Sequence, residues 1–228
     1  MTINQQGRCL LEKITITLGV AILFSACDGI FEDIYDNNKT ISDEAKITEG
    51  EFTVDATSYT AWHYLDLEAD SISFVTSEIE AAETETGIPE NWTIAIHRYD
   101  VKTNGGAAAE TNYASIDELQ TALDADPALL AQLNFSADTL TESKIIIDMS
   151  HMMEGYLIYQ KSYYNAVISR WLDVDTSTMP PIYTLSHKTY ILRTADEKYY
   201  ALYLVNYMNE KSIKGNMTVQ YKQLAIEK

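Results

Sequence analysis

Cysteine and basic residues are both scarce in this chain of 228 residues. The only cysteines are Cys9 and Cys27, so a framework of several disulfides is excluded as the source of stability. Lys and Arg number 16 against 34 Asp and Glu, which gives a formal net charge of −18 at pH 7. A chain this acidic repels nucleic acid and anionic membrane faces, so we expect no nucleic-acid partner.

Motifs that would indicate an enzyme are also missing. The sequence has no G-x-S-x-G elbow, no Gly-rich phosphate loop, no H-E-x-x-H and no C-x-x-C pair. The four histidines are scattered, with no two at i, i+4 spacing; they are His63, His97, His151 and His187. The sequence therefore predicts a protein that is not an enzyme.

The N-terminal residues have the pattern of a lipoprotein signal. Arg8 and Lys13 precede an almost uninterrupted apolar run at 14–24, which is too short to span a bilayer core of roughly 30 Å. Small residues at 25–26 stand directly before Cys27, which is the pattern that signal peptidase II cuts. We expect cleavage before Cys27 and lipidation of its sulfur. The alternative is an ordinary secretory signal with an incidental cysteine.

This interpretation divides the chain into three parts. Residues 1–26 would be the signal peptide, and residues 27–50 the lipidated cysteine with a polar, flexible tether. Residues 51–228 would form one folded domain, long enough to be held together by its core alone.

The folded part is dominated by runs that are typical of strands. In 215–226 apolar and polar residues alternate, which indicates a half-buried strand. In 198–208 both faces are apolar or aromatic, so we expect a central strand, joined to its predecessor by a short hairpin turn at 195–197. The predicted strands are 51–59, 60–67, 71–75, 91–100, 143–149, 166–174, 183–194, 198–208 and 215–226.

A helical insertion interrupts the strands near 115–135. Ser115 and Glu118 form a capping-box pattern that is followed by leucines and alanines at helical spacing. Pro127 divides this segment, so we expect two short helices rather than one. The residues at 104–106, Asn-Gly-Gly, mark a turn. The predicted fold class is therefore all-β, a single antiparallel domain with a short helical insertion.

Sulfur and imidazole are concentrated at two places in the second half of the chain. The run at 148–153 reads Asp-Met-Ser-His-Met-Met, and Met179 lies in the run Thr-Ser-Thr-Met-Pro-Pro at 176–181. Thioether sulfur is a soft ligand suited to haem iron or Cu(I). Methionines more often fill cores, however, so these residues alone leave both interpretations open.

A longer pattern resembles a known family. The run at 91–106, NWTIAIHRYDVKTNGG, is similar to the signature of the HmuY family of haem-binding lipoproteins from Bacteroidetes. The similarity continues through Trp171-Leu172, the residues at 181–183 and 190–193, and the run at 204–221. It covers nearly the whole body, from about Trp62 to Tyr221. His97 lies within the signature, in the middle of a predicted strand, and we expect it to be structural.

The resemblance implies an all-β, HmuY-like domain that holds one haem (iron protoporphyrin IX) between two loops, each supplying one axial ligand. In members with a histidine pair, the second histidine corresponds to Thr176, which is a poor iron ligand. A branch of the family uses methionines instead, and its pattern matches this chain better. The resemblance therefore favours Met152 and Met179 as axial ligands, with Met153, His151 and Met149 as alternates on the first loop.

The haem would also need apolar walls and a place for its propionates. Tyr156, Tyr159 and Tyr183 flank the two ligand loops and could stack on the porphyrin, although packing within a sheet is as good an explanation for any one of them. The propionates would project into solvent or meet a local cation, for which the candidates are Lys161, Arg170 and Lys188.

The resemblance also implies a haem-capturing (hemophore-like) protein that passes its ligand to a TonB-dependent transporter. We expect the chain to be lipid-anchored to the outer membrane and exposed at the cell surface, although the acidic residues after Cys27 leave the choice of membrane face open. A rival hypothesis is a surface lipoprotein that binds glycan or protein through its 16 tyrosines, without haem.

Overall fold

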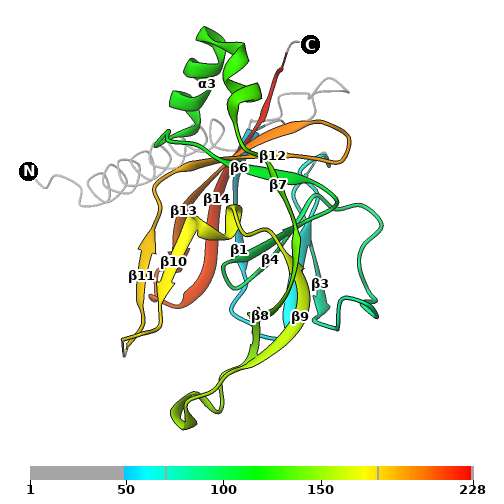
Figure 1. Ribbon diagram of the computed structural model, residues 1–228, viewed down its shortest axis with the longest axis vertical. Coiled ribbons are helices and arrows are strands. Elements are labelled where there is room, and N and C mark those ends of the chain that lie inside the picture. Colours follow the sequence, from blue (N-terminus) through cyan, green and yellow to red (C-terminus); the bar gives the residue numbers. More distant parts are fainter. Residues whose placement is uncertain (1–48, 70, 179, 227–228) are drawn as a thin grey trace, which may run out of the picture. The chain divides into compact units, whose positions relative to one another are not determined.

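The main sheet has six antiparallel strands and contains the first predicted strand and the last three (Figure 1). The computed structural model describes residues 49–226 except 70 and 179. The predicted alternation of apolar and polar residues at 215–226 is present in the sheet. Met217, Val219 and Tyr221 are buried, while the residues between them are more exposed. In spatial order the strands are β1 (Glu49–Asp55), β14 (Lys214–Leu224), β13 (Tyr199–Met208), β12 (Thr189–Arg193), β6 (Ala107–Glu110) and β7 (Ser136–Ala137).

A second antiparallel sheet of four strands packs against one face of the main sheet. Its order is β3 (Phe74–Glu78), β2 (Ala61–Leu65), β4 (Ile94–His97) and β5 (Asp100–Thr103). The principal core lies between the two sheets, where Leu65 and Ile96 belong to the same buried cluster as Leu202 and Val219. Burial of such residues supplies roughly 1.5–3 kcal/mol each, which stabilises the fold without disulfides.

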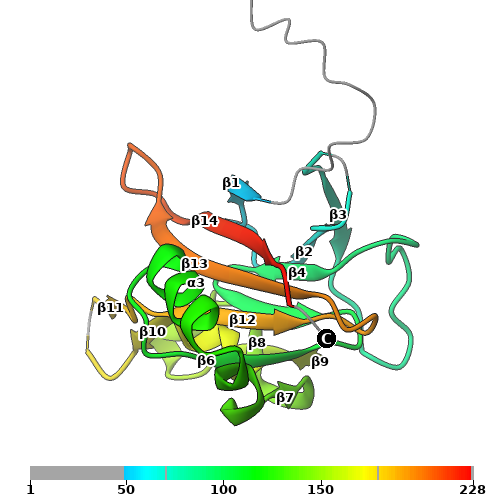
Figure 2. The same cartoon turned by 90° about the horizontal axis from the view of Figure 1, so that it is seen from above.

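The helical insertion packs against the opposite face of the main sheet (Figure 2). The helix α3 (Ile116–Ala125) begins as predicted, since the Ser115 side chain accepts a hydrogen bond from the Glu118 amide at 3.1 Å. Its buried Leu119 contacts the main sheet in a cluster that includes Ile191 and Ala201. The 3₁₀-helix η1 (Pro127–Gln132) follows, so two short helices are present, divided at Pro127.

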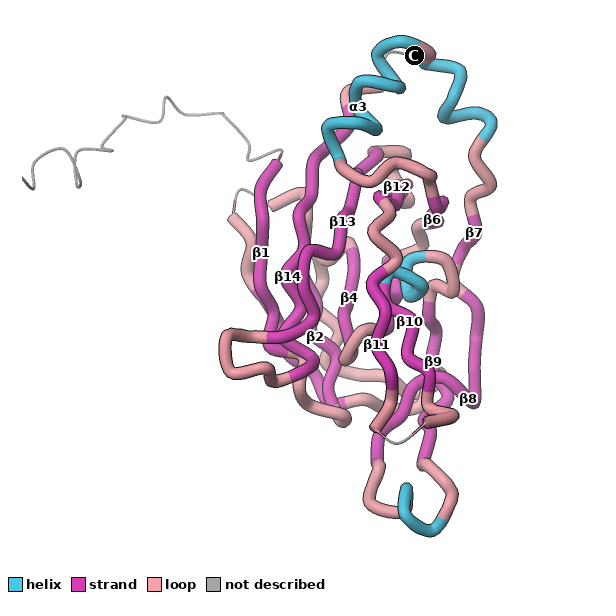
Figure 3. The backbone as a smooth tube through the Cα atoms, turned by 90° about the vertical axis from the view of Figure 1, so that its left-hand side faces the viewer, coloured by secondary structure: helices cyan, strands magenta, loops and turns pink. Residues whose placement is uncertain are grey.

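Two hairpin ribbons complete the domain. The first pairs β8 (Thr139–Asp148) with β9 (Ile158–Tyr164), and its tip contains the 3₁₀-helix η2 (Met152–Glu154). The second pairs β10 (Leu172–Asp175) with β11 (Ile182–Leu185), directly after the 3₁₀-helix η3 (Ile168–Trp171). Both tips point toward the same end of the domain in Figures 1 and 3. The first ribbon is fixed to the outer face of the second sheet, where Ile145 joins a buried cluster with Trp62 and Tyr64.

The fold class and several details of the sequence prediction are confirmed. The strand at 198–208 is central, since β13 lies between β12 and β14, and the turn at 195–197 joins β12 to β13. The turn at 104–106 is also present. Gly106 is required there, because a Cβ atom at this position would lie 2.6 Å from the Arg193 carbonyl oxygen.

Other boundaries differ from the prediction. The run at 91–100 is not one strand, because the chain turns at Arg98 (φ 53°) between β4 and β5. The run at 183–194 is likewise divided, since His187 (φ 52°) separates β11 from β12. The run at 166–174 begins with η3 and becomes a strand only at Leu172. Positive φ in a non-glycine residue leaves no sequence signal, so these turns could not be read from composition.

Further differences concern the start of the domain and two strands that the sequence did not predict. β1 begins at Glu49, two residues inside the predicted tether. β6 and β9 were not predicted, because β6 is alanine-rich and β9 mixes polar and aromatic residues. The predicted signal peptide, Cys27 and the remainder of the tether lie outside the described residues. Within the described part of the chain, no helix is both long enough and apolar enough to cross a membrane.

Candidate functional site

A cavity of about 220 Å³ lies between the tips of the two ribbons. It brings together the two segments in which the sequence concentrates methionine, although these segments are more than twenty residues apart. Met149 and Met152 lie on its first side, and Thr176 and Pro181 on its second. The full lining is Ile146, Met149, Met152, Gly155, Tyr156 and Leu157 from the first ribbon, Val174, Thr176, Pro181 and Tyr183 from the second, and Tyr59 and Tyr99 from the body.

The first tip is shaped by local hydrogen bonds. Asp148 Oδ1 accepts a hydrogen bond from the Ser150 amide at 2.7 Å, which turns the chain as soon as β8 ends. These bonds hold the pKa of the Asp148 carboxyl below its usual value, so it stays charged at neutral pH. The Met152 amide donates to the Met149 carbonyl oxygen at 3.0 Å, and Gly155 (φ 90°) returns the chain toward β9. The two methionines are thus presented from one compact turn.

The second tip is also shaped by an aspartate that accepts a hydrogen bond from a backbone amide two residues further along the chain. Asp175 Oδ1 accepts a hydrogen bond from the Ser177 amide at 2.8 Å, and this bonding also lowers the pKa of the Asp175 carboxyl. The Thr178 hydroxyl donates to the Pro180 carbonyl oxygen at 3.2 Å. Two consecutive prolines then lead into β11 and restrict the backbone of the loop. Met179, the predicted ligand on this tip, lies outside the described residues.

The alternates on the first tip differ in their surroundings. Met153 is 87% exposed and does not line the cavity. His151 lies 3.1 Å from Glu154 Oε2 through Nδ1 and stacks on the Tyr156 ring, with the ring centres 4.6 Å apart. His151 is not among the lining residues either. Of the four residues predicted on this tip, Met149 and Met152 are those that face the cavity.

The predicted aromatic walls are present in part. Tyr156 and Tyr183 line the cavity, whereas Tyr159 does not. Sequence reasoning missed Tyr59 and Tyr99, which form the inner wall. The Tyr99 ring meets Tyr183 edge-on, with centres 6.0 Å apart. Burial raises the pKa of both Tyr99 and Tyr183, so the phenols of these two residues remain neutral near pH 7.

The inner wall is held in place by residues of the signature run. The buried His97 donates from Nε2 to the Tyr59 carbonyl oxygen at 3.0 Å, and the Arg98 guanidinium lies 4.3 Å from the centre of the Tyr59 ring. His97 is only 1% exposed. It therefore supports the cavity from behind, and the expected structural role fits this placement.

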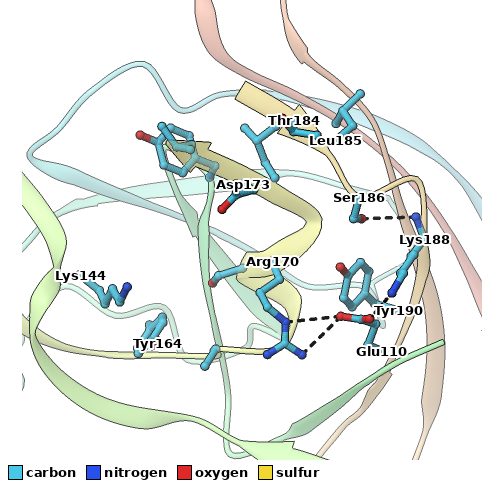
Figure 4. A pocket seen from close by; sticks show the side chains of 15 residues that line it. Glu110, Lys144, Tyr164, Arg170, Asp173, Thr184, Leu185, Ser186, Lys188 and Tyr190 are labelled. Atoms are coloured by element: carbon cyan, nitrogen blue, oxygen red, sulfur yellow. Dashed lines mark hydrogen bonds and ion pairs between the residues drawn. The ribbon is translucent and has the colours of Figure 1, made fainter. Parts of the chain in front are cut away.

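The cations predicted for propionates lie elsewhere. Lys161 pairs with Glu83 outside the cavity, and Arg170 and Lys188 both pair with Glu110 in a second, larger cavity shown in Figure 4. One cation beside the wall is Lys214, whose Nζ lies 3.9 Å from the centre of the Tyr183 ring. Among the described residues, no group of three or more His, Cys, Asp or Glu could hold a metal ion. The donors of the tip cavity are thioethers, hydroxyls and phenols.

Comparisons with known proteins agree on one family. A family model described as HmuY protein matches residues 58–221. Two crystal structures cover most of the chain. A candidate lipoprotein from Bacteroides fragilis NCTC 9343 is 43% identical, with a TM-score of 0.68 over 82% of this chain and 94% of that one. A candidate HmuY-like heme-binding protein from Bacteroides vulgatus ATCC 8482 is 41% identical, with a TM-score of 0.64 over 77% and 91%.

A more distant structure shows the same fold. It is an apo HmuY analogue from Tannerella forsythia, 22% identical, with a TM-score of 0.60 over 78% of this chain and 96% of that one. No curated protein matches the chain.

Proposed function

We propose, since this chain belongs to the HmuY family, that it binds haem between the tips of its two ribbons without catalysing a reaction. The observation that carries the proposal is the tip cavity, in which Met149 and Met152 of one ribbon face residues of the other across tyrosine walls. A relative that is 41% identical is described as HmuY-like and heme-binding, which supports the same ligand here.

The proposed axial ligands of the haem iron are Met152 and Met179. Met152 lines the cavity, whereas Met153 is exposed and His151 is already engaged with Glu154 and Tyr156. Met149 also lines the cavity and is the principal alternate. On the second tip, Thr176 lines the cavity but offers only a hydroxyl, which is a poor ligand for iron. Met179 is the thioether three residues further along the same tip.

The walls suit a flat apolar ligand. Tyr59, Tyr99 and Tyr183 offer aromatic faces with phenols that can hydrogen-bond at the wet edge. A volume of about 220 Å³ is below the roughly 300–1,000 Å³ of typical small-molecule sites, so we expect the tips to separate when haem binds. Each tip projects from a two-stranded ribbon, an element that carries little stability where nothing else packs against it.

Thioether ligation predicts a dependence on redox state. Two neutral sulfurs favour ferrous over ferric iron, whereas imidazole accommodates both. We expect haem to bind more tightly under dithionite than in air, with a sharper Soret band in the reduced complex. The measurement is a haem titration followed by absorbance with and without dithionite. Equal affinity in both states, with a spectrum like that of a bis-histidine complex, would contradict methionine ligation while leaving haem binding intact.

The remaining parts of the proposal concern location and partner. We propose that a lipid on Cys27 anchors the chain to the outer membrane, facing outward, and that haem passes to a TonB-dependent transporter. The 43% identical structure is described as a candidate lipoprotein, which supports the anchor. Protease treatment of intact cells is expected to remove the domain. Full protection under conditions that leave the cells unbroken would place the protein on an inner face.

A further inference from the structure

A second cavity, of about 730 Å³, lies beside the tip cavity and is shown in Figure 4. Its volume is within the range of small-molecule sites. Residues from five parts of the fold surround it, namely the turn between β4 and β5, the end of β6, β8, the segment from Tyr164 through η3 to β10, and the segment from β11 to β12. Leu172 and Leu185 supply apolar surface, and Glu110, Lys144, Arg170, Asp173 and Lys188 supply charged groups.

The cationic side chains that line this cavity outnumber the carboxylates. Lys144, Arg170 and Lys188 line it together with two carboxylates, Glu110 and Asp173. Glu110 is shared, because Lys188 donates to its Oε1 while Arg170 donates to its Oε2. One carboxylate therefore serves two cations. Lys144 has no hydrogen-bond or ion-pair partner among the described residues. The cavity has a local excess of positive charge in a chain whose formal net charge is −18.

Arg170 has the greatest capacity to bind a ligand. Its contacts with Glu110 are long, at 3.4 Å from Nε and 3.3 Å from Nη2, and its side chain is 61% exposed. A guanidinium has five N–H donors, so most of them are not used by Glu110. A planar, weakly held guanidinium at the side of a cavity is suited to bidentate recognition of a carboxylate.

A buried phenol lies at the same place. Tyr190 is fully buried and lines the cavity. Burial raises the pKa of its phenol, against the opposing effect of a hydrogen bond with Ser186, so the hydroxyl stays neutral. Figure 4 shows Tyr190 beside Glu110, between Arg170 and Lys188.

The two cavities are adjacent but have different linings. Tyr99 and Val174 are the residues that contribute to both, so they lie at the partition between them. Tyr99 is held there by the Trp171 indole, which donates from Nε1 to the Tyr99 carbonyl oxygen at 2.8 Å. Met149 and Met152 do not line the larger cavity.

We propose that the larger cavity is a second ligand site, which binds a small amphipathic carboxylate through Arg170, separately from the haem site. Lys144 and Lys188 add positive charge, and Leu172 and Leu185 contact the apolar part of the ligand. Glu110 occupies the position of the ligand's carboxylate when the site is empty, since the Lys188 and Arg170 side chains hold its pKa below the usual value and keep it charged.

The test uses two fluorescent probes that differ in one charge. Dansylglycine carries a carboxylate, and dansylamide carries the same fluorophore without it. With the chain at residues 28–228, which contains every described strand and helix, we expect dansylglycine to bind about tenfold more tightly than dansylamide. Arg170→Gln is expected to remove that difference, and Glu110→Gln to increase dansylglycine affinity, because it frees Arg170 and Lys188.

Two controls keep the proposal falsifiable. Lys211→Gln makes the same change of charge at an exposed turn and is expected to leave both affinities unchanged. Saturating haem is expected to leave dansylglycine bound. The proposal is overturned if both probes bind equally, if Arg170→Gln behaves like Lys211→Gln, or if haem displaces dansylglycine one for one. The outcome does not depend on whether haem binds through methionine.

Discussion

Replacement of both Met152 and Met179 by alanine is expected to abolish the spectrum of the reduced haem complex and to weaken haem binding at least about 100-fold. The axial ligands are the direct bonds between protein and iron. Changes that only affect residues behind a metal ligand already cost about 10–100-fold in affinity, so loss of both ligands should exceed this. The measurement is a haem titration under dithionite, followed at the Soret band.

Met153→Ala is the matched control for this experiment. It makes the same chemical change one residue along the chain, at a side chain that is 87% exposed and does not line the cavity. We expect it to bind haem like the unaltered chain. If Met152→Ala, like Met153→Ala, leaves the haem spectrum unchanged while Met149→Ala removes it, the ligand on the first tip is Met149. If neither Met152→Ala nor Met149→Ala alters the haem spectrum, the assignment of a methionine ligand to this tip is wrong.

Lys102→Ala is expected to lower the free energy of unfolding by about 3–5 kcal/mol, because it leaves a buried carboxylate without its partner. Lys102 and Glu85 form an ion pair at 2.5 Å, with side chains 3% and 9% exposed. The Tyr64 hydroxyl donates to the same Glu85 oxygen at 2.7 Å, and Lys102 Nζ lies 4.7 Å from the centre of the Trp62 ring. Burial lowers the pKa of Lys102, against the opposing effect of Glu85.

The control is an exposed ion pair of similar length. Lys222 and Glu49 are 3.0 Å apart, with side chains 30% and 64% exposed, so Lys222→Ala should cost no more than about 1 kcal/mol. Urea unfolding of both variants makes the comparison. The double variant Glu85→Gln/Lys102→Met is expected to recover most of the lost stability, because it removes both buried charges. Equal midpoints for Lys102→Ala and Lys222→Ala would contradict the assignment.

The buried Lys102–Glu85 pair also affects the position of the tip cavity's first ribbon. Trp62 and Tyr64, which surround the pair, belong to the cluster that fixes Ile145 of the first ribbon to the second sheet. A loosened cluster would release the ribbon that presents Met149 and Met152. We therefore expect Lys102→Ala to weaken haem binding as well, although no residue of the pair lines the tip cavity.

Much of the fold could be predicted because its signals are local. The alternation in β14, the two apolar faces of β13 and the Ser115 cap are properties of single segments, and all are present. Arg98 and His187 show where such reasoning fails. Each adopts a positive φ inside a run that we predicted as one strand, and the chain turns there between two strands. β6 was missed for a similar reason, since its alanines are buried by pairing with β12 rather than by their own propensity.

The residues of the candidate site likewise include some that could be predicted from the sequence and some that could not. The methionines of the first tip are adjacent in sequence, so their grouping could be predicted before the structure was known. Tyr59 and Tyr99 could not, because sheet formation brings them to the cavity from distant segments of the chain. The larger cavity has no sequence motif at all, since Glu110, Arg170 and Lys188 come from three separate elements.

The measurement that tests the central claim most directly is a titration of residues 28–228 with haemin, followed at the Soret band in air and under dithionite. We expect a shifted Soret band that saturates at one haem per chain, with tighter binding in the reduced state. An unshifted band in both states would contradict haem binding and favour the rival hypothesis of a surface lipoprotein that binds glycan or protein through its tyrosines.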